Sequence, residues 1–214
     1  MPSKVPPVTR YLLIANVLAF ILQLWLHDDS TAALTRYFAL WPLGPSPYAD
    51  VAGFEPWQLV TYAFLHGGYE HIAFNMFGLW MFGGVIERSF GARNYTIYYV
   101  VCAIMAALAQ LVVVKYFTHG FYPTLGASGA LFGLLLAFGM LYPREKMFLI
   151  FLPIPLPAWL FVTGYAVVEL VLGVTGTQAG VAHFAHLGGM VGGYVMIQYW
   201  RGRLPLKPKR RLLR

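Results

Sequence analysis

The sequence predicts an all-α integral membrane protein, a bundle of six transmembrane helices with a long interfacial first loop. Three observations lead to this prediction. Of the 214 residues, 59% are hydrophobic and 11% are charged, with a mean hydropathy of +0.63, whereas a soluble domain carries about 25% charged residues. Six segments approach the roughly 20 apolar residues that cross a bilayer. The positive charges gather on one side of these segments.

The six predicted spans leave room for a single membrane domain. We expect a cytoplasmic N-terminus over residues 1–10, the helical domain over residues 11–199 and a basic cytoplasmic tail over residues 200–214. The spans are Tyr11–His27, His71–Glu87, Tyr95–Phe117, Ser128–Tyr142, Pro157–Val174 and Val181–Tyr199. A signal peptide is the alternative interpretation of the first span, but no small-residue cleavage site follows it.

The connection between the first two spans is unusually long, running from Asp28 to about Glu70. It is rich in large apolar side chains, and Trp and Tyr favour the membrane–water interface. These side chains include Phe38, Leu40, Trp41, Leu43, Phe54 and Trp57. We expect this first loop to lie partly in the interface, to cap the bundle, or both.

The distribution of positive charge predicts the orientation of the chain. Six spans place both termini on one side, and of the 15 Lys and Arg residues only Arg36 and Lys115 fall on the other. The positive-inside rule makes the terminal side cytoplasmic. The tail KPKRRLLR then serves as a topology anchor near anionic lipid, so we expect the bilayer as its partner and no nucleic acid. The minimal form with short tails favours a bacterial inner membrane.

Polar residues converge at one depth in three of the spans. The second, fourth and sixth spans run in the same direction, and their outer ends carry His71 with Asn75, Ser128, and His183 with His186. Polar side chains inside a membrane are costly and mark functional sites. Because random placement would scatter them, we interpret this layer as the site.

Ser128 begins the fourth span, which at 15 residues is about 22 Å long against a hydrocarbon core of about 30 Å. The start of this span is therefore expected to be recessed, with residues 120–127 lining a water-filled cavity. A helix N-terminus favours developing negative charge. Ser128 is thus a candidate nucleophile, which needs a general base.

His186 is the best candidate for that base. Its span contains glycines in pairs four apart, which permit close helix contact, and the fourth span has small residues to match. These are Gly188, Gly189, Gly192 and Gly193, facing Gly129, Ala130 and Gly133. Glu169 is the only carboxylate well inside a span, and we expect it to be structural or interface-facing, so the site is predicted as a Ser–His dyad. His71 and Asn75 are either oxyanion donors or polar contacts between helices.

Four motifs resemble the rhomboid intramembrane serine proteases over nearly the whole chain. They are LHGGYEHIAFN at residues 65–75, GGVIERSFG at residues 83–91, GASG at residues 126–129 and AHLGGMVGG at residues 185–193. The resemblance implies a six-helix fold and cleavage of peptide bonds in or near transmembrane segments of membrane proteins, without metal or cofactor.

The resemblance also implies a role for each matching residue. It makes Ser128 the nucleophile and His186 the base, and it makes His71 and Asn75 the oxyanion donors. It gives supporting roles to Gly126, Gly129, Phe132, Gly189, Gly193 and His66, with Phe132 stacked on the base and His66 holding the first loop. One departure is Trp57-Gln58, where many relatives have Trp-Arg.

Three other interpretations come from different classes. Haem or metal ligation by the six histidines leaves Asn75 and Ser128 unexplained, and no carboxylate is expected to complete a zinc site. A non-catalytic relative that binds membrane helices has no need of both Ser128 and His186. A transporter is disfavoured because the chain has no inverted repeat. The single cysteine, Cys102, is interpreted as a packing residue.

Overall fold

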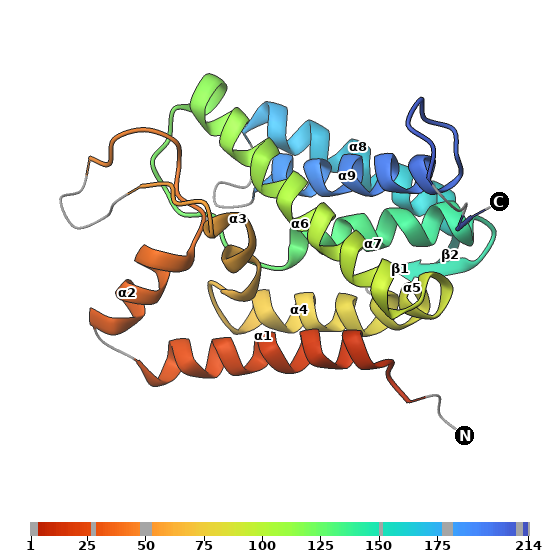
Figure 1. Ribbon diagram of the computed structural model, residues 1–214, viewed down its shortest axis with the longest axis horizontal. Coiled ribbons are helices and arrows are strands. Elements are labelled where there is room, and N and C mark those ends of the chain that lie inside the picture. The colour runs from red at the N-terminus through yellow and green to blue at the C-terminus, as the bar shows by residue number, and fades with distance from the viewer. Residues whose placement is uncertain are drawn as a thin grey trace.

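The computed structural model describes residues 4–26, 29–47, 53–149, 152–176, 182–208 and 212–213, which are mostly helical (Figure 1). The elements are α1 (Pro7–Trp25), α2 (Asp29–Phe38), α3 (Gln58–Thr61), the 3-10 turn η1 (Tyr62–Phe64), α4 (Tyr69–Gly78), the π-helical η2 (Leu79–Gly83), α5 (Gly84–Phe90), α6 (Ala92–Val113), the π-helical η3 (Val114–Thr118), α7 (Ser128–Leu141), β1 (Lys146–Leu149), β2 (Leu152–Pro157), α8 (Ala158–Thr175) and α9 (His183–Trp200). The predicted span ends His27 and Val181 lie outside the described residues, as does part of the basic tail.

Three of the described helical segments are long and apolar enough to cross a membrane, judged by length and composition. They are α1, α8 and the α6–η3 segment Ala92–Thr118, and α7 is a shorter apolar helix. The two remaining predicted spans coincide with α4–η2–α5 and with α9. The helical membrane architecture is therefore confirmed, while the count of six crossings stays a prediction.

Two parts of the architecture differ from the prediction. The first loop contains the helices α2 and α3. The expected all-α fold also contains an antiparallel hairpin, in which Lys146 of β1 pairs with Pro157 of β2. Prolines at alternate positions 153, 155 and 157 remove backbone donors and block a helix, but they are tolerated in an edge strand.

The core of the molecule is formed by α6, α7 and α9, which pack against one another. Figure 1 shows α1 and α4 along one side of α6 and α7, and α9 with α8 on the other. Cys102 of α6 is fully buried in the core, as its interpretation as a packing residue requires. The exposed face of α1 carries Ile14, Leu18, Ile21 and Trp25, which is the apolar surface that a lipid-facing helix presents.

A buried carboxylate holds the start of α1 on the bundle. Glu87 of α5 accepts hydrogen bonds from the backbone N–H groups of Val8 and Thr9, at 2.9 and 2.7 Å, and from the Thr9 hydroxyl at 2.8 Å. These donors are among the first N–H groups of the helix, which have no intrahelical partner. The charge at the helix N-terminus is favourable as well.

The first loop is anchored by Gln58, at the position where relatives often have arginine. Its side chain is 1% exposed. The Gln58 Oε1 accepts a hydrogen bond from the backbone N–H of Trp41 at 3.1 Å. The Gln58 Nε2 donates to the carbonyl oxygens of Gly53 and Tyr37 at 3.3 and 3.4 Å. A buried amide with partners on both ends therefore ties three separate parts of the first loop together.

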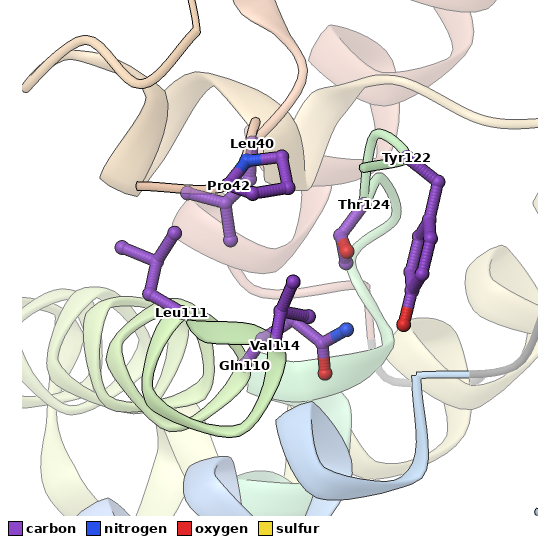
Figure 2. Close-up of a pocket in the computed structure, with 7 residues that line it drawn as sticks. All are labelled: Leu40, Pro42, Gln110, Leu111, Val114, Tyr122 and Thr124. Atoms are coloured by element: carbon purple, nitrogen blue, oxygen red, sulfur yellow. The ribbon is translucent and has the colours of Figure 1, made fainter. Parts of the chain in front are cut away.

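The first loop also holds the segment that leads into α7. Leu40 and Thr124 exchange two backbone hydrogen bonds of 2.9 Å, and the Gly126 N–H donates to the Tyr62 carbonyl at 2.9 Å. Figure 2 shows Leu40 and Thr124 on either side of a small pocket closed by α6 residues such as Gln110. Ser128 and His186 do not line this pocket, which lies between the first loop, the end of α6 and the segment that leads into α7.

Candidate active site

Ser128 and His186 lie within hydrogen-bond distance of each other. Ser128 is the first residue of α7, His186 lies one turn into α9, and the Ser128 Oγ is 2.8 Å from the His186 Nε2. The first N–H groups of α7 have no intrahelical partner, and with the positive end of the helix dipole they favour negative charge beside Ser128. The pair thus combines a hydroxyl, a base and a region that favours negative charge, as acyl transfer requires.

The contact between Ser128 and His186 depends on glycines at the points where α7 and α9 pack against each other and against α6. A Cβ atom on Gly189 of α9 would overlap the backbone carbonyl of Gly129 in α7. A Cβ on Gly129 would overlap Ala106 of α6, and one on Gly193 would overlap the Tyr98 hydroxyl. The α7 and α9 backbones therefore touch beside Ser128 and one turn after His186, which brings the two side chains together.

The His186 ring is also held from one face. The Phe132 ring lies one helical turn after Ser128 and stacks on the imidazole, with the ring centroids 4.2 Å apart and the planes inclined by 6°. Such a contact restricts rotation of the imidazole. Phe132 thus lies where the sequence comparison with the rhomboid motifs expects an aromatic ring.

The second nitrogen of His186 has an acidic partner, which corrects the expectation of a Ser–His pair without one. Glu169 of α8 is 6% exposed. Its Oε2 lies 2.9 Å from the His186 Nδ1 and 2.7 Å from the His183 Nδ1. Because an ionised carboxylate only accepts hydrogen bonds, both Nδ1 atoms donate, which leaves the His186 Nε2 free to accept from Ser128.

The same three side chains offer one ligand atom each to a metal ion, within 4.8 Å of one another, which corrects the expectation that no carboxylate completes a ligand set. Ligands at 2.0–2.1 Å from a tetrahedral zinc lie about 3.3 Å apart. The O–N distances here are 2.7 and 2.9 Å, which are those of hydrogen bonds. Both ring nitrogens of His186 are thereby engaged within the protein, and neither is directed toward a haem iron.

His71 and Asn75 of α4 approach the segment just before Ser128. A Cβ on Gly126 would lie 2.6 Å from the His71 Nε2 and 3.7 Å from the Asn75 Nδ2, and the φ of Gly126 is +119°. Only glycine fits this left-handed conformation beside the imidazole. The backbone N–H of Gly67 donates to the His71 Nδ1 at 3.3 Å, so in a neutral imidazole the His71 Nε2 carries the hydrogen.

Asn75 supplies a second donor at this place. Its side chain is 5% exposed, and its Nδ2 has no hydrogen-bond partner among the described residues. An unpartnered buried donor is costly and calls for a ligand. The His71 Nε2 and the Asn75 Nδ2 thus lie beside the same glycine, two residues before Ser128.

His66 lies behind this group. Its ring is T-shaped against that of His71, with the centroids 5.1 Å apart. Its backbone is tied to α1, because the His66 N–H donates to the Gln23 Oε1 at 3.0 Å and the Gln23 Nε2 donates to the His66 carbonyl at 3.2 Å. His66 therefore connects α1 to the loop that precedes α4.

A model of the family described as the Rhomboid domain matches residues 53–203 of the chain. This range contains the four sequence motifs described above. This chain belongs to the rhomboid family. The match contains Ser128, Glu169 and His186, as well as the loop anchor Gln58. With the apolar helices described above, it identifies an integral membrane protein.

Named rhomboid relatives come from bacteria and from mitochondria. The chain is 31% identical over 192 residues to the rhomboid protease GluP of Bacillus subtilis (strain 168), covering 88% of this chain and 34% of that protein. It is 33% identical over 163 residues to "Rhomboid protein 1, mitochondrial" of Saccharomyces cerevisiae, covering 72% and 45%. It is 29% identical over 205 residues to the rhomboid protease GlpG of Serratia proteamaculans, covering 94% and 65%. The chain thus spans about one third to two thirds of the length of these relatives.

Proposed function

We propose that the chain is an intramembrane serine protease that cleaves peptide bonds in or near transmembrane segments of membrane proteins. The observation that carries this proposal is the 2.8 Å contact between the Ser128 Oγ and the His186 Nε2 at the start of α7. Two relatives that carry the name rhomboid protease support it. In this proposal Ser128 is the nucleophile and His186 is the general base.

The proposed reaction proceeds through an acyl-enzyme. His186 Nε2 takes the proton of the Ser128 hydroxyl while Oγ bonds to the scissile carbonyl carbon, and the carbonyl π electrons move to oxygen. The resulting oxyanion accepts hydrogen bonds from the His71 Nε2–H, the Asn75 amide and the Ser128 backbone N–H. The protonated His186 then gives its proton to the leaving amine, and water attacks the acyl-enzyme by the same steps in reverse order.

The proposal includes the arrangement in the membrane. In this arrangement the chain crosses the membrane six times over residues 11–199, and both termini lie in the cytoplasm. Ser128 and His186 then lie near the opposite face of the membrane, where the extracytoplasmic ends of substrate helices are accessible. The bilayer and membrane-protein substrates are the proposed partners, and the chemistry uses no cofactor or metal. We propose a bacterial inner membrane location, although the family also includes mitochondrial members.

The proposal is tested by proteolysis in a bilayer. The purified chain is reconstituted into liposomes with a single-span test protein carrying small residues at the outer end of its transmembrane segment, and products are mapped by mass spectrometry. We expect one cleavage in or beside the span, absent with Ser128→Ala. Cleavage that persists undiminished in Ser128→Ala contradicts the proposal.

A further inference from the structure

Glu169 is a buried carboxylate on a helix that is otherwise largely exposed. Its neighbours Val168 and Leu170 are 50% and 49% exposed, whereas Glu169 is 6% exposed. In α8 the only other buried residues are Ala158 and Val162. A carboxylate in a membrane-spanning segment is costly and is kept where it serves a function.

The contacts of Glu169 select one tautomer of His186. Both imidazoles donate from Nδ1 to the same Oε2 atom, at 2.7 Å from His183 and 2.9 Å from His186. A neutral imidazole that carries its proton on Nδ1 has a lone pair on Nε2. That lone pair lies 2.8 Å from the Ser128 Oγ, which is the arrangement that a base needs to accept the hydroxyl proton.

His183 holds the carboxylate from the other side. It lies one turn before His186 on α9, is 5% exposed, and has no partner at Nε2 among the described residues. Among the described residues, the polar contact of its side chain is therefore the one to Glu169. With two donors on Oε2, the carboxylate cannot rotate away from His186 without losing both hydrogen bonds.

We propose that Glu169 is a positioning residue for His186, and that His183 positions Glu169. The inference rests on the proposed protease function and extends the pair to Ser128–His186–Glu169. During attack the Ser128 proton moves to the His186 Nε2, the O–H bond breaks and the N–H bond forms. The Nδ1–H of the resulting imidazolium stays hydrogen-bonded to the ionised Glu169. The carboxylate stabilises the positive charge without taking the proton.

The proposal is tested by the rate at which a fluorophosphonate probe labels the purified chain in detergent, measured against probe concentration. We expect Glu169→Gln to lower the maximal labelling rate by about 100-fold or more, because the tautomer of His186 is no longer selected. The probe concentration that gives half-maximal labelling should be unchanged, because Glu169 acts through His186.

Matched variants separate positioning from structural effects. His183→Asn keeps a nitrogen donor near the Nδ1 position and should label within about threefold of wild type, whereas His183→Ala should lose about tenfold, the value of one lost hydrogen bond. Glu87→Gln neutralises another buried carboxylate, on α5 beside Thr9, and should leave labelling unchanged. Labelling of Glu169→Gln within threefold of wild type overturns the proposal.

A measurement that requires no active variant completes the test. Nitrogen-15 NMR of labelled histidines in Ser128→Ala should show His186 protonated at Nδ1, and protonation at Nε2 overturns the proposal even if Glu169→Gln fails to fold. The two proposals fail separately. If Ser128→Ala is labelled at the wild-type rate, the protease function is contradicted. If Ser128→Ala is not labelled but Glu169→Gln is labelled at the wild-type rate, only the role of Glu169 is contradicted.

Discussion

Replacing Gly189 with alanine is expected to separate the helices that carry the reacting groups. A Cβ on Gly189 would overlap the Gly129 carbonyl oxygen and lie 2.7 Å from its carbon, whereas carbon atoms normally approach to about 3.5–4.0 Å. The obstacle is backbone, which no rotamer change can move. The α7 and α9 backbones must therefore part by roughly 1 Å at this point.

The separation acts almost directly on the reacting pair, because Ser128 is adjacent to Gly129 and His186 lies one turn before Gly189. The 2.8 Å contact between Oγ and Nε2 would lengthen to about 3.8 Å, which is beyond a hydrogen bond. A misplacement of about 1 Å costs on the order of 100-fold in rate. Overpacking of this kind also costs about 1–3 kcal/mol of stability.

The assay is the fluorophosphonate labelling rate of Gly189→Ala, with thermal unfolding measured on the same sample. Gly164→Ala is the matched control, because Gly164 is also a helical glycine but a Cβ there would meet nothing within 4 Å. We expect Gly164→Ala to label like wild type and Gly189→Ala to label about 100-fold more slowly. A Gly189→Ala protein with wild-type labelling and an unchanged Tm would refute the packing argument.

Three further predictions concern neighbouring residues. Asn75→Ala should lower cleavage by about 100- to 1000-fold in kcat because one oxyanion donor is lost, and an unchanged kcat would exclude that role. Phe132→Leu should slow labelling by about two- to tenfold because the stacking contact with His186 is lost, while Phe132→Tyr should retain the wild-type rate; equal rates in all three proteins would contradict this. Burial, with a contribution from nearby His71, lowers the pKa of His66 to about 4. The unfolded chain therefore binds a proton near pH 6.5 that the folded chain does not, and the free energy of unfolding should decline as pH falls from about 6.5 to 4. His66→Asn should reduce that slope in denaturant titrations, and an unaltered slope would contradict the assignment.

The positions of the helices and the proximity of Ser128 to His186 could be predicted from the sequence. Both predictions use the length of each span and the depth of its polar residues in the membrane. Span length set the depth of Ser128, and glycine spacing indicated which helices touch. The rotation of α8 about its own axis could not be predicted in this way. Its residues are apolar on all sides, so no stripe shows which face turns inward, and only the packed structure places Glu169 against His186.

The signals that were available but missed are local ones. Alternating prolines over residues 153–157 exclude a helix and favour an extended edge strand, yet the hairpin was not predicted. In the first loop Gln58 makes three hydrogen bonds with backbone groups. An amide supplies both a donor and an acceptor, but which backbone groups it meets depends on how the loop folds.

The measurement that tests the central claim most directly is the site of covalent labelling by a fluorophosphonate, located by mass spectrometry in the wild type, Ser128→Ala and His186→Ala. We expect modification of the wild type at Ser128 alone and no modification of either variant. Modification at another serine, or equal labelling of all three proteins, would show that Ser128 is not a nucleophile activated by His186.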